Sequence, residues 1–196
     1  MKKLILGAAL GLTALTSTVL AHDAFSSYIN SKGEMVLPEN YQTEMSHMGS
    51  FLVPSGGAAG FHHVYTQPET IEAFKATGEF PDGAVIIKEI RGTEKADYTT
   101  GAGVSSATGI AQVFMMIKDT KGRFKGNKLW GEGWAWSLHK PGSNKNVATD
   151  YKVDCLGCHE PVRSQDFIYT QAYPILEAGG SSKTSNAPAG SMSSGN

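Results

Sequence analysis

Short runs of apolar and β-branched residues recur along the chain and predict strands. The run 84–90, AVIIKEI, follows turn-forming residues at 81–83 and has the composition of a strand. Further strands are expected at 61–65, 110–118 and 130–138, the last two being separated by the turn-forming sequence DTKG. Successive strands joined by short turns predict an antiparallel meander.

Helices are expected at two places before the 84–90 strand. One is a short helix near 38–46. The other begins at 66–69, TQPE, which has the residue types of a capping box, carries Ile71 and Phe74, and ends at Gly78. A few helices combined with a meander of strands predict an α+β domain that is mainly an antiparallel β-sheet.

The two ends of the chain differ in composition from the part between them. Residues 1–21 contain a lysine pair, an apolar run and a small-residue ending, the pattern of a cleavable signal peptide. A membrane anchor is disfavoured because Gly, Ser and Thr interrupt the run and no basic cluster follows it. Residues 178–196 are rich in Gly and Ser and are expected to form a disordered tail. We therefore expect one domain, 22–177, exported to the periplasm.

The charge balance excludes one class of partner. The chain has 17 Lys and Arg against 18 Asp and Glu, a net charge of −1. Cleavage of the signal peptide removes two lysines and makes the charge slightly more negative. A balance this weak and mixed is not that of a nucleic-acid-binding protein.

The only two cysteines, Cys155 and Cys158, are separated by two residues and followed directly by His159. A disulfide across so short a loop would restrict the unfolded chain little. A redox pair is expected at the start of a helix in a βαβ unit, and zinc needs a second ligand pair that the sequence lacks. The pattern CxxCH instead indicates one covalent c-type haem, held by two thioether bonds, with His159 as the proximal iron ligand.

Four blocks of the sequence resemble the cytochrome P-460 family. They are FPDGAVIIKEIRG (80–92), MIKDTKGRFKGNKLWGEGWAWSL (116–138), NVATDYKVDCLGCHEPV (146–162) and DFIYTQAYPIL (166–176). The resemblance implies a periplasmic haem c protein with a mostly antiparallel sheet, usually a homodimer, that oxidises hydroxylamine or handles nitric oxide. An oxidising member needs a periplasmic electron acceptor. The haem is expected near the C-terminal CxxCH.

The distinguishing feature of the family is a lysine whose amine is bonded to the porphyrin rim, and Lys88 lies on the matching strand. Alternation puts Lys88 in a row with Ile86 and Ile90, where loss of water favours the neutral, nucleophilic amine. The alternative is a strand lysine whose stem packs and whose head reaches water. The related cytochromes c′-beta share the fold but lack the link, so Lys88 separates the two branches.

The distal side of the haem departs from the family pattern. In hydroxylamine-oxidising members a pocket carboxylate lies on the strand after the lysine strand, but 112–116, QVFMM, contains no acid. Met115 and Met116 point to opposite faces, so one of them is a candidate sixth ligand or distal-pocket residue, with core packing as the alternative. Phe114 is a candidate cap of the distal face or an ordinary core residue.

Histidines supply the candidates for proton transfer. His62 is the leading candidate, because it follows an aromatic residue at the place where the family often has a pocket arginine. A half-exposed strand histidine is the alternative. His63 points to the other face, and His139, at a strand end, is expected at the surface.

Trp130, Trp134 and Trp136 occupy even-numbered positions of the expected 130–138 strand. We therefore expect all three on one face of it. They are candidates for the haem-pocket wall or a dimer interface, and core packing is the alternative.

Three functions are consistent with these features. The first is oxidation of hydroxylamine at a five-coordinate iron. The second is non-enzymatic binding of nitric oxide or carbon monoxide in the c′-beta manner, which the missing carboxylate favours. The third is simple electron transfer, with a methionine as the sixth ligand.

Overall fold

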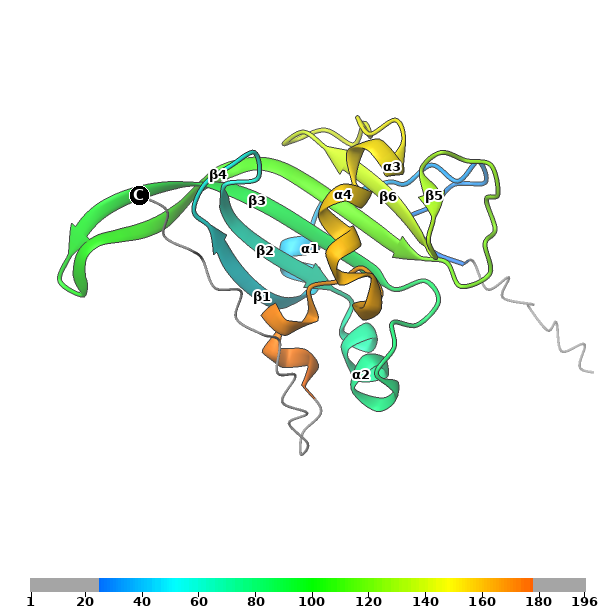
Figure 1. The fold of residues 1–196 in the computed structure, drawn as a ribbon, viewed down its shortest axis with the longest axis horizontal. Helices are drawn as coiled ribbons and strands as arrows, with labels where there is room; N and C mark the ends of the chain where they lie inside the picture. The colour runs from blue at the N-terminus through cyan, green and yellow to red at the C-terminus, as the bar shows by residue number, and fades with distance from the viewer. Residues whose placement is uncertain (1–24, 178–196) are drawn as a thin grey trace, which may run out of the picture.

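Six strands pair in an antiparallel sheet whose order is β1-β2-β3-β4-β6-β5. They are β1 (Ser46–Val53), β2 (Gly60–Thr66), β3 (Val85–Tyr98), β4 (Gly101–Lys118), β5 (Trp130–Gly131) and β6 (Trp134–His139). The computed structural model describes residues 25–177 (Figure 1), so the predicted signal peptide and tail lie outside the described residues. The expected α+β class, with a mainly antiparallel sheet, is confirmed.

The helical segments are short and cover both sides of the sheet (Figure 1). They are α1 (Tyr41–Glu44), α2 (Pro68–Thr77), α3 (Tyr151–Asp154), α4 (Leu156–His159) and the 3₁₀ turns η1 (Glu160–Gln165), η2 (Thr170–Ala172) and η3 (Pro174–Leu176). No helix among residues 25–177 is long and apolar enough to cross a membrane.

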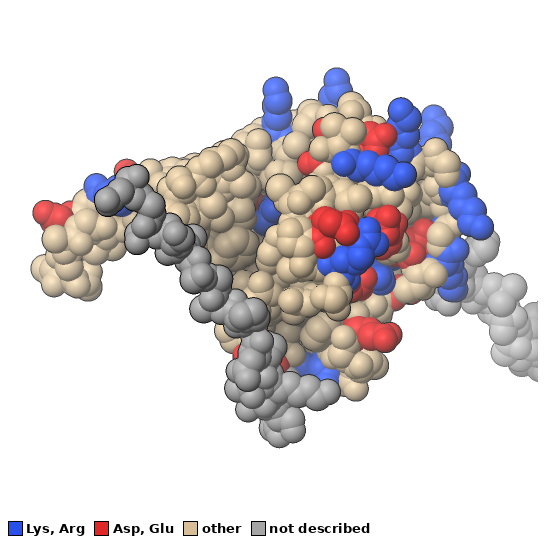
Figure 2. Space-filling model, viewed as in Figure 1, with Lys and Arg blue, Asp and Glu red and all other residues tan. Residues whose placement is uncertain are grey.

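Alternation along the strands divides the core into two clusters. Ile86, Met116 and Trp136 pack with Cys155 and the C-terminal helices, and we call this side of the sheet the motif face. Their neighbours Val85, Ile87, Met115, Ile117 and Ala135 pack on the opposite side, the back face, with the N-terminal segment and α1. Figure 2 shows the molecule from the motif face, which is hollowed between the β3–β4 ribbon and the C-terminal helices.

The start of the helix α2 differs from the prediction. Thr66 does not cap it, because Thr66 is the last residue of β2 and its buried hydroxyl donates to the carbonyl of Val85 at 2.6 Å. The helix begins at Pro68, a residue well suited to a first turn. It ends as predicted at Gly78, whose φ of 77° is the left-handed conformation that glycine adopts most readily.

The short helix expected near 38–46 is a single turn, α1, and the chain enters β1 at Ser46. β1 was not predicted from the sequence. Its burial pattern alternates, but it holds a glycine, Gly49, and a register shift between His47 and Gly49, so few apolar positions mark the strand.

The strand expected at 130–138 is two strands joined by a tight turn. Glu132 and Gly133 have φ values of 58° and 78°, so the chain reverses there and Gly131 pairs with Trp134. The prediction that the three tryptophans share a face is therefore wrong. Trp130 packs in the back-face core, whereas Trp134 and Trp136 pack on the motif face.

β3 and β4 run further than predicted and project from the sheet as a two-stranded ribbon (Figure 1). The residues of this extension are mostly exposed. They are small or polar, as in GAGVSSATG at 101–109, and so lack the apolar alternation that marks the strand parts nearer the core.

Candidate haem site

The two cysteines lie at the junction of α3 and α4. Cys155 ends α3 and precedes α4, and its amide donates to the carbonyl of Tyr151 at 3.0 Å. Cys158 follows within the same turn, its amide donating to the carbonyl of Cys155 at 3.2 Å. Both thiols are free, with Cys155 buried and Cys158 exposed. The turn thus presents two sulfur atoms on one short helical segment, as thioether attachment requires.

His159 is held in one tautomer by a backbone carbonyl. Its Nδ1 lies 2.7 Å from the oxygen of Phe167, so Nδ1 carries the proton and Nε2 is left as the ligating nitrogen. The ring meets Trp136 in a T-shaped contact with centroids 5.1 Å apart. Burial lowers the pKa of His159 to about 4, although the Phe167 hydrogen bond acts in the opposite direction. The low pKa keeps the imidazole in the neutral form that binds metals.

Lys88 lies on the motif face, paired across the sheet with Val64 on β2 and Phe114 on β4. Its Nζ is 4.5 Å from the centre of the Phe114 ring. Burial lowers the pKa of the Lys88 amine, and the nearby sulfur atoms of Cys158 and Cys155 act in the opposite direction. The thiols lose that opposing effect once they become thioethers, which favours the neutral amine further.

His62 shares the motif face with Lys88 and is 4% exposed. Its Nε2 donates to the carbonyl of Ala58 at 2.7 Å, and its ring lies 4.7 Å from that of Phe51 on β1. The other nitrogen, Nδ1, is buried and has no hydrogen-bond partner within residues 25–177. Burial lowers the pKa of His62, so the ring is neutral at neutral pH and Nδ1 has a free lone pair.

The structure separates the distal candidates of β4. Met115 is fully buried in the back-face core, so it lies away from the cysteines, whereas Met116 packs on the motif face between Ile86 and Trp136. The prediction that the two methionines face opposite sides is confirmed. Phe114 is partly buried on the motif face beside Lys88.

The remaining histidines lie apart from the cysteines. His63 faces the back side of β2, where its Nδ1 is hydrogen-bonded to the hydroxyl of Ser50 and, through it, to His47. His139 was expected at the surface, but it is fully buried, with Nε2 3.0 Å from the hydroxyl of Ser137. The expectation was wrong because the chain after β6 folds back over this strand end, where Val147 donates to the carbonyl of Leu138.

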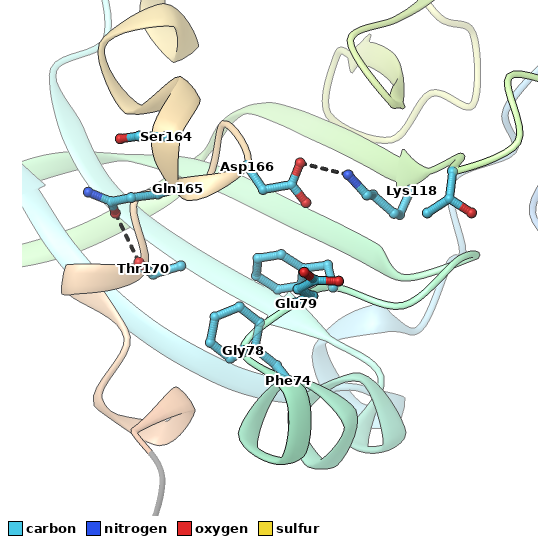
Figure 3. Close-up of a pocket in the computed structure, with 10 residues that line it drawn as sticks. Phe74, Gly78, Glu79, Lys118, Ser164, Gln165, Asp166 and Thr170 are labelled. Carbon is cyan, nitrogen blue, oxygen red and sulfur yellow. Dashed lines mark hydrogen bonds and ion pairs between the residues drawn. The ribbon is translucent and has the colours of Figure 1, made fainter. Parts of the chain in front are cut away.

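Several residues near the site carry no signal in the sequence. Phe51 belongs to the unpredicted β1, and Tyr169 donates from its hydroxyl to the carbonyl of Cys158 at 2.6 Å. Asp166 and Lys118 form an ion pair beside a cavity of about 640 Å³ (Figure 3). These contacts join segments far apart in the chain, so local patterns do not reveal them.

The donor set fits a haem better than a bare metal ion. Residues 25–177 hold no group of three or more His, Cys, Asp or Glu side chains placed to bind a metal. They do hold one neutral imidazole with a fixed tautomer next to two free thiols, which suits an iron whose four equatorial ligands come from a porphyrin. The fold and this site define a c-type haem protein.

Comparison with known proteins agrees with this class. The family model for cytochrome P460 matches residues 38–170, which is well over half of the chain. The chain therefore belongs to the cytochrome P460 family of haem c proteins. No curated protein matches it.

Proposed function

We propose that this protein is an exported mono-haem enzyme that oxidises hydroxylamine, with His159 as the residue that would hold the haem iron. The observation that carries the proposal is the position of Lys88, whose partly buried amine faces the two haem-binding cysteines from the sheet. In this family a lysine bonded to the porphyrin rim distinguishes the cross-linked branch. We assign that bond to Lys88, and its position on the motif face opposite the cysteines supports the assignment.

Each residue of the site has a separate task. Cys155 and Cys158 form the thioether bonds, and His159 binds the iron through Nε2. When bound, the haem supplies an iron that accepts electrons from the substrate nitrogen. The electrons leave to a periplasmic acceptor, and the protein acts as a homodimer.

Lys88 forms a third covalent link. This link would join its Nζ to a porphyrin carbon in place of one N–H and one C–H bond, and two protons and two electrons would pass to an oxidant of the peroxide class. The neutral amine is the nucleophile, because a protonated amine has no free lone pair. Burial beside Phe114 lowers the pKa of Lys88 and so favours that form.

His62 takes a proton from the substrate. Oxidation of hydroxylamine releases protons together with electrons, so the site needs a base. The lone pair on Nδ1 is available, and the Ala58 carbonyl fixes the proton on Nε2. His62 thus replaces the carboxylate that β4 lacks.

Reversible binding of nitric oxide is the second candidate function. It is favoured by the apolar character of the motif face around Lys88, where Val64, Ile90, Phe114 and Met116 contribute no acid. Electron transfer is less well supported, because Met116, the methionine on the correct face, is packed in the core.

Peptide mass mapping of the exported holoprotein tests the proposal. The Lys88 peptide is expected to be joined through one haem to the Cys155–Cys158 peptide. The mass of the joined species should be lower than the sum of its parts by two hydrogen atoms, one from the amine and one from the porphyrin. Lys88→Ala should lose the link and hydroxylamine oxidation together, whereas Lys95→Ala, on the exposed part of the same strand, should keep both. A wild-type haem attached through the cysteines alone, with rapid nitric oxide binding and no turnover, would refute the proposal and support gas binding.

A further inference from the structure

The chain makes an unusual reversal just after η1. Asp166 and Phe167 have φ values of 57° and 63°, and neither is a glycine. Side chains with a Cβ disfavour this conformation, so surrounding contacts must hold it in place. The reversal determines where the Phe167 carbonyl points.

Contacts with the sheet hold the first of these residues. The Asp166 carboxylate accepts from Lys118 Nζ at 2.6 Å, as Figure 3 shows. It also accepts from the Trp134 indole N–H at 3.1 Å. Lys118 and Trp134 are cross-strand partners on β4 and β6, and the Lys118 amine lies 4.9 Å from the centre of the Trp134 ring. We call Asp166, Lys118 and Trp134 the sheet clamp.

The second residue of the reversal contacts the proximal histidine. The Phe167 carbonyl accepts from His159 Nδ1 at 2.7 Å. The Phe167 ring is buried and meets Trp136 at 6.2 Å, with the Arg163 guanidinium 4.7 Å above it. The clamp therefore ends one residue before the oxygen that orients the imidazole.

We propose that Asp166, tied to the sheet by Lys118 and Trp134, is a positioning residue that sets the hydrogen bond between Phe167 and His159 and thereby the reduction potential of the haem iron. A strong Nδ1–H···O bond makes Nε2 a more basic ligand and stabilises the ferric state. The proposal rests on His159 as the iron ligand of the proposed haem site, but not on hydroxylamine as the substrate.

The ion pair at the centre of the clamp is partly shielded from water. The Lys118 and Asp166 side chains are 12% and 33% exposed, and both line the cavity of about 640 Å³. A partly buried, charge-assisted hydrogen bond constrains geometry more than a surface pair does. Loss of either partner frees the reversal at Asp166.

The test uses two variants of the holoprotein, Asp166→Asn and Lys118→Met. The deciding measurement is the Fe–His stretching frequency of the ferrous protein by resonance Raman spectroscopy, with the reduction potential recorded alongside. A weaker Phe167–His159 bond lowers the frequency in both variants and raises the potential of Asp166→Asn. An unchanged frequency in either variant overturns the proposal.

These readouts separate the clamp from a through-space charge effect. Removing a negative charge near the iron raises the potential and removing a positive one lowers it, but neither needs to change the Fe–His frequency. Opposite potential shifts with constant frequencies therefore mean that Asp166 and Lys118 act only as charges, and the clamp is refuted. Both readouts are independent of hydroxylamine turnover, so failure of the proposed function leaves this result intact.

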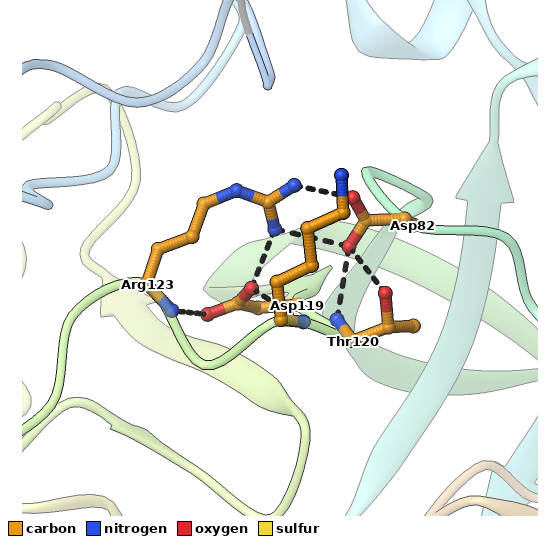
Figure 4. Close-up of polar contacts among 5 residues, drawn as sticks. Asp82, Asp119, Thr120 and Arg123 are labelled. Atoms are coloured by element: carbon orange, nitrogen blue, oxygen red, sulfur yellow. Dashed lines mark hydrogen bonds and ion pairs between the residues drawn. The ribbon is translucent and has the colours of Figure 1, made fainter.

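A matched control comes from a second aspartate ion pair (Figure 4). Asp82 accepts hydrogen bonds from Arg123 and Thr120 at the turn before β3, and none of these residues contacts Phe167 in the hydrogen bonds described above. Asp82→Asn should lower the melting temperature but leave the Fe–His frequency unchanged. If Asp82→Asn lowers the frequency as much as Asp166→Asn does, the effect is one of general destabilisation and the proposal fails.

Discussion

Substitution of His62 by glutamine tests the proposed proton acceptor, with the same substitution at the neighbouring His63 as the control. His62 and His63 are neighbours on β2 but point to opposite faces of the sheet. His62→Gln removes the basic nitrogen from the motif face, whereas His63→Gln changes a hydrogen bond to Ser50 on the back face. A base acting at the haem should therefore be lost in the first variant alone.

The size of the effect follows from the contacts of His62. A glutamine amide can still donate to the Ala58 carbonyl, a bond worth about 1 kcal/mol, so the fold should be kept. What disappears is the free lone pair of Nδ1. Loss of a general base typically lowers kcat by about 10²- to 10⁴-fold, and we expect a decrease in that range with little change in KM.

The pH dependence gives a second signature. Burial lowers the pKa of His62 below its usual 6.5, so the ring is already neutral at pH 7. Activity should be constant near neutral pH and fall as the pH drops through that lowered pKa, because protonation removes the lone pair. In His62→Gln this acid limb should be absent.

The assay is steady-state reduction of an electron acceptor by hydroxylamine between pH 5 and 8, with haem content matched between variants. Equal kcat values for His62→Gln and the wild type would refute the base assignment, even if hydroxylamine is turned over. Equal losses in both variants would point to a structural role for β2 instead of proton transfer.

Three further substitutions test the fold around the site. In Gly131→Ala the new Cβ would lie 2.5 Å from Cε1 of Tyr151, the residue that begins α3. We therefore expect the free energy of unfolding, measured by thermal unfolding, to fall by about 1–3 kcal/mol and haem incorporation to decrease. Gly57→Ala is the neutral control, because a Cβ at Gly57 meets open space. Glu89→Ala removes an acceptor shared by two tyrosines, a glutamine and an arginine on the back face. The free energy of unfolding in urea should fall by about 3–5 kcal/mol, while the haem spectrum stays unchanged. Burial lowers the pKa of His139 in the folded state, so the unfolded chain binds a proton more readily and stability is lost as the pH falls below about 6.5. His139→Gln should therefore flatten the dependence of the melting temperature on pH. An unchanged slope would contradict this.

The sequence predicted the elements whose residues carry a local signal. The apolar run at 84–90 predicts a strand, and the alternation of side chains along a strand places Lys88 on the correct face. Gly78 ends α2 because only a left-handed residue closes that turn readily. The CxxCH motif needs no tertiary information, since its chemistry lies in five consecutive residues. These features were predictable because each depends on neighbours in the chain.

The features that were missed depend on contacts between distant segments. The chain reverses at Glu132 and Gly133, between Trp130 and Trp134. All three tryptophans stand at even-numbered positions, so the sequence pattern is that of one uninterrupted strand. His139 is buried by the chain that follows β6 and not by anything on its own strand. Asp166 gains its partners 32 and 48 residues away, so no spacing rule points to it.

β3 carries two adjacent residues of opposite charge, Lys88 and Glu89, whose surroundings differ. Glu89, on the back face, is neutralised by Arg91 at 2.7 Å and by further donors. Lys88, on the motif face, has no carboxylate within ion-pair distance among residues 25–177. A desolvated amine without a counter-ion costs stability that a methionine of similar length would not. We infer that a side chain which weakens the fold at the point facing the cysteines serves chemistry at its amine, and the covalent link to the haem proposed above is such a reaction.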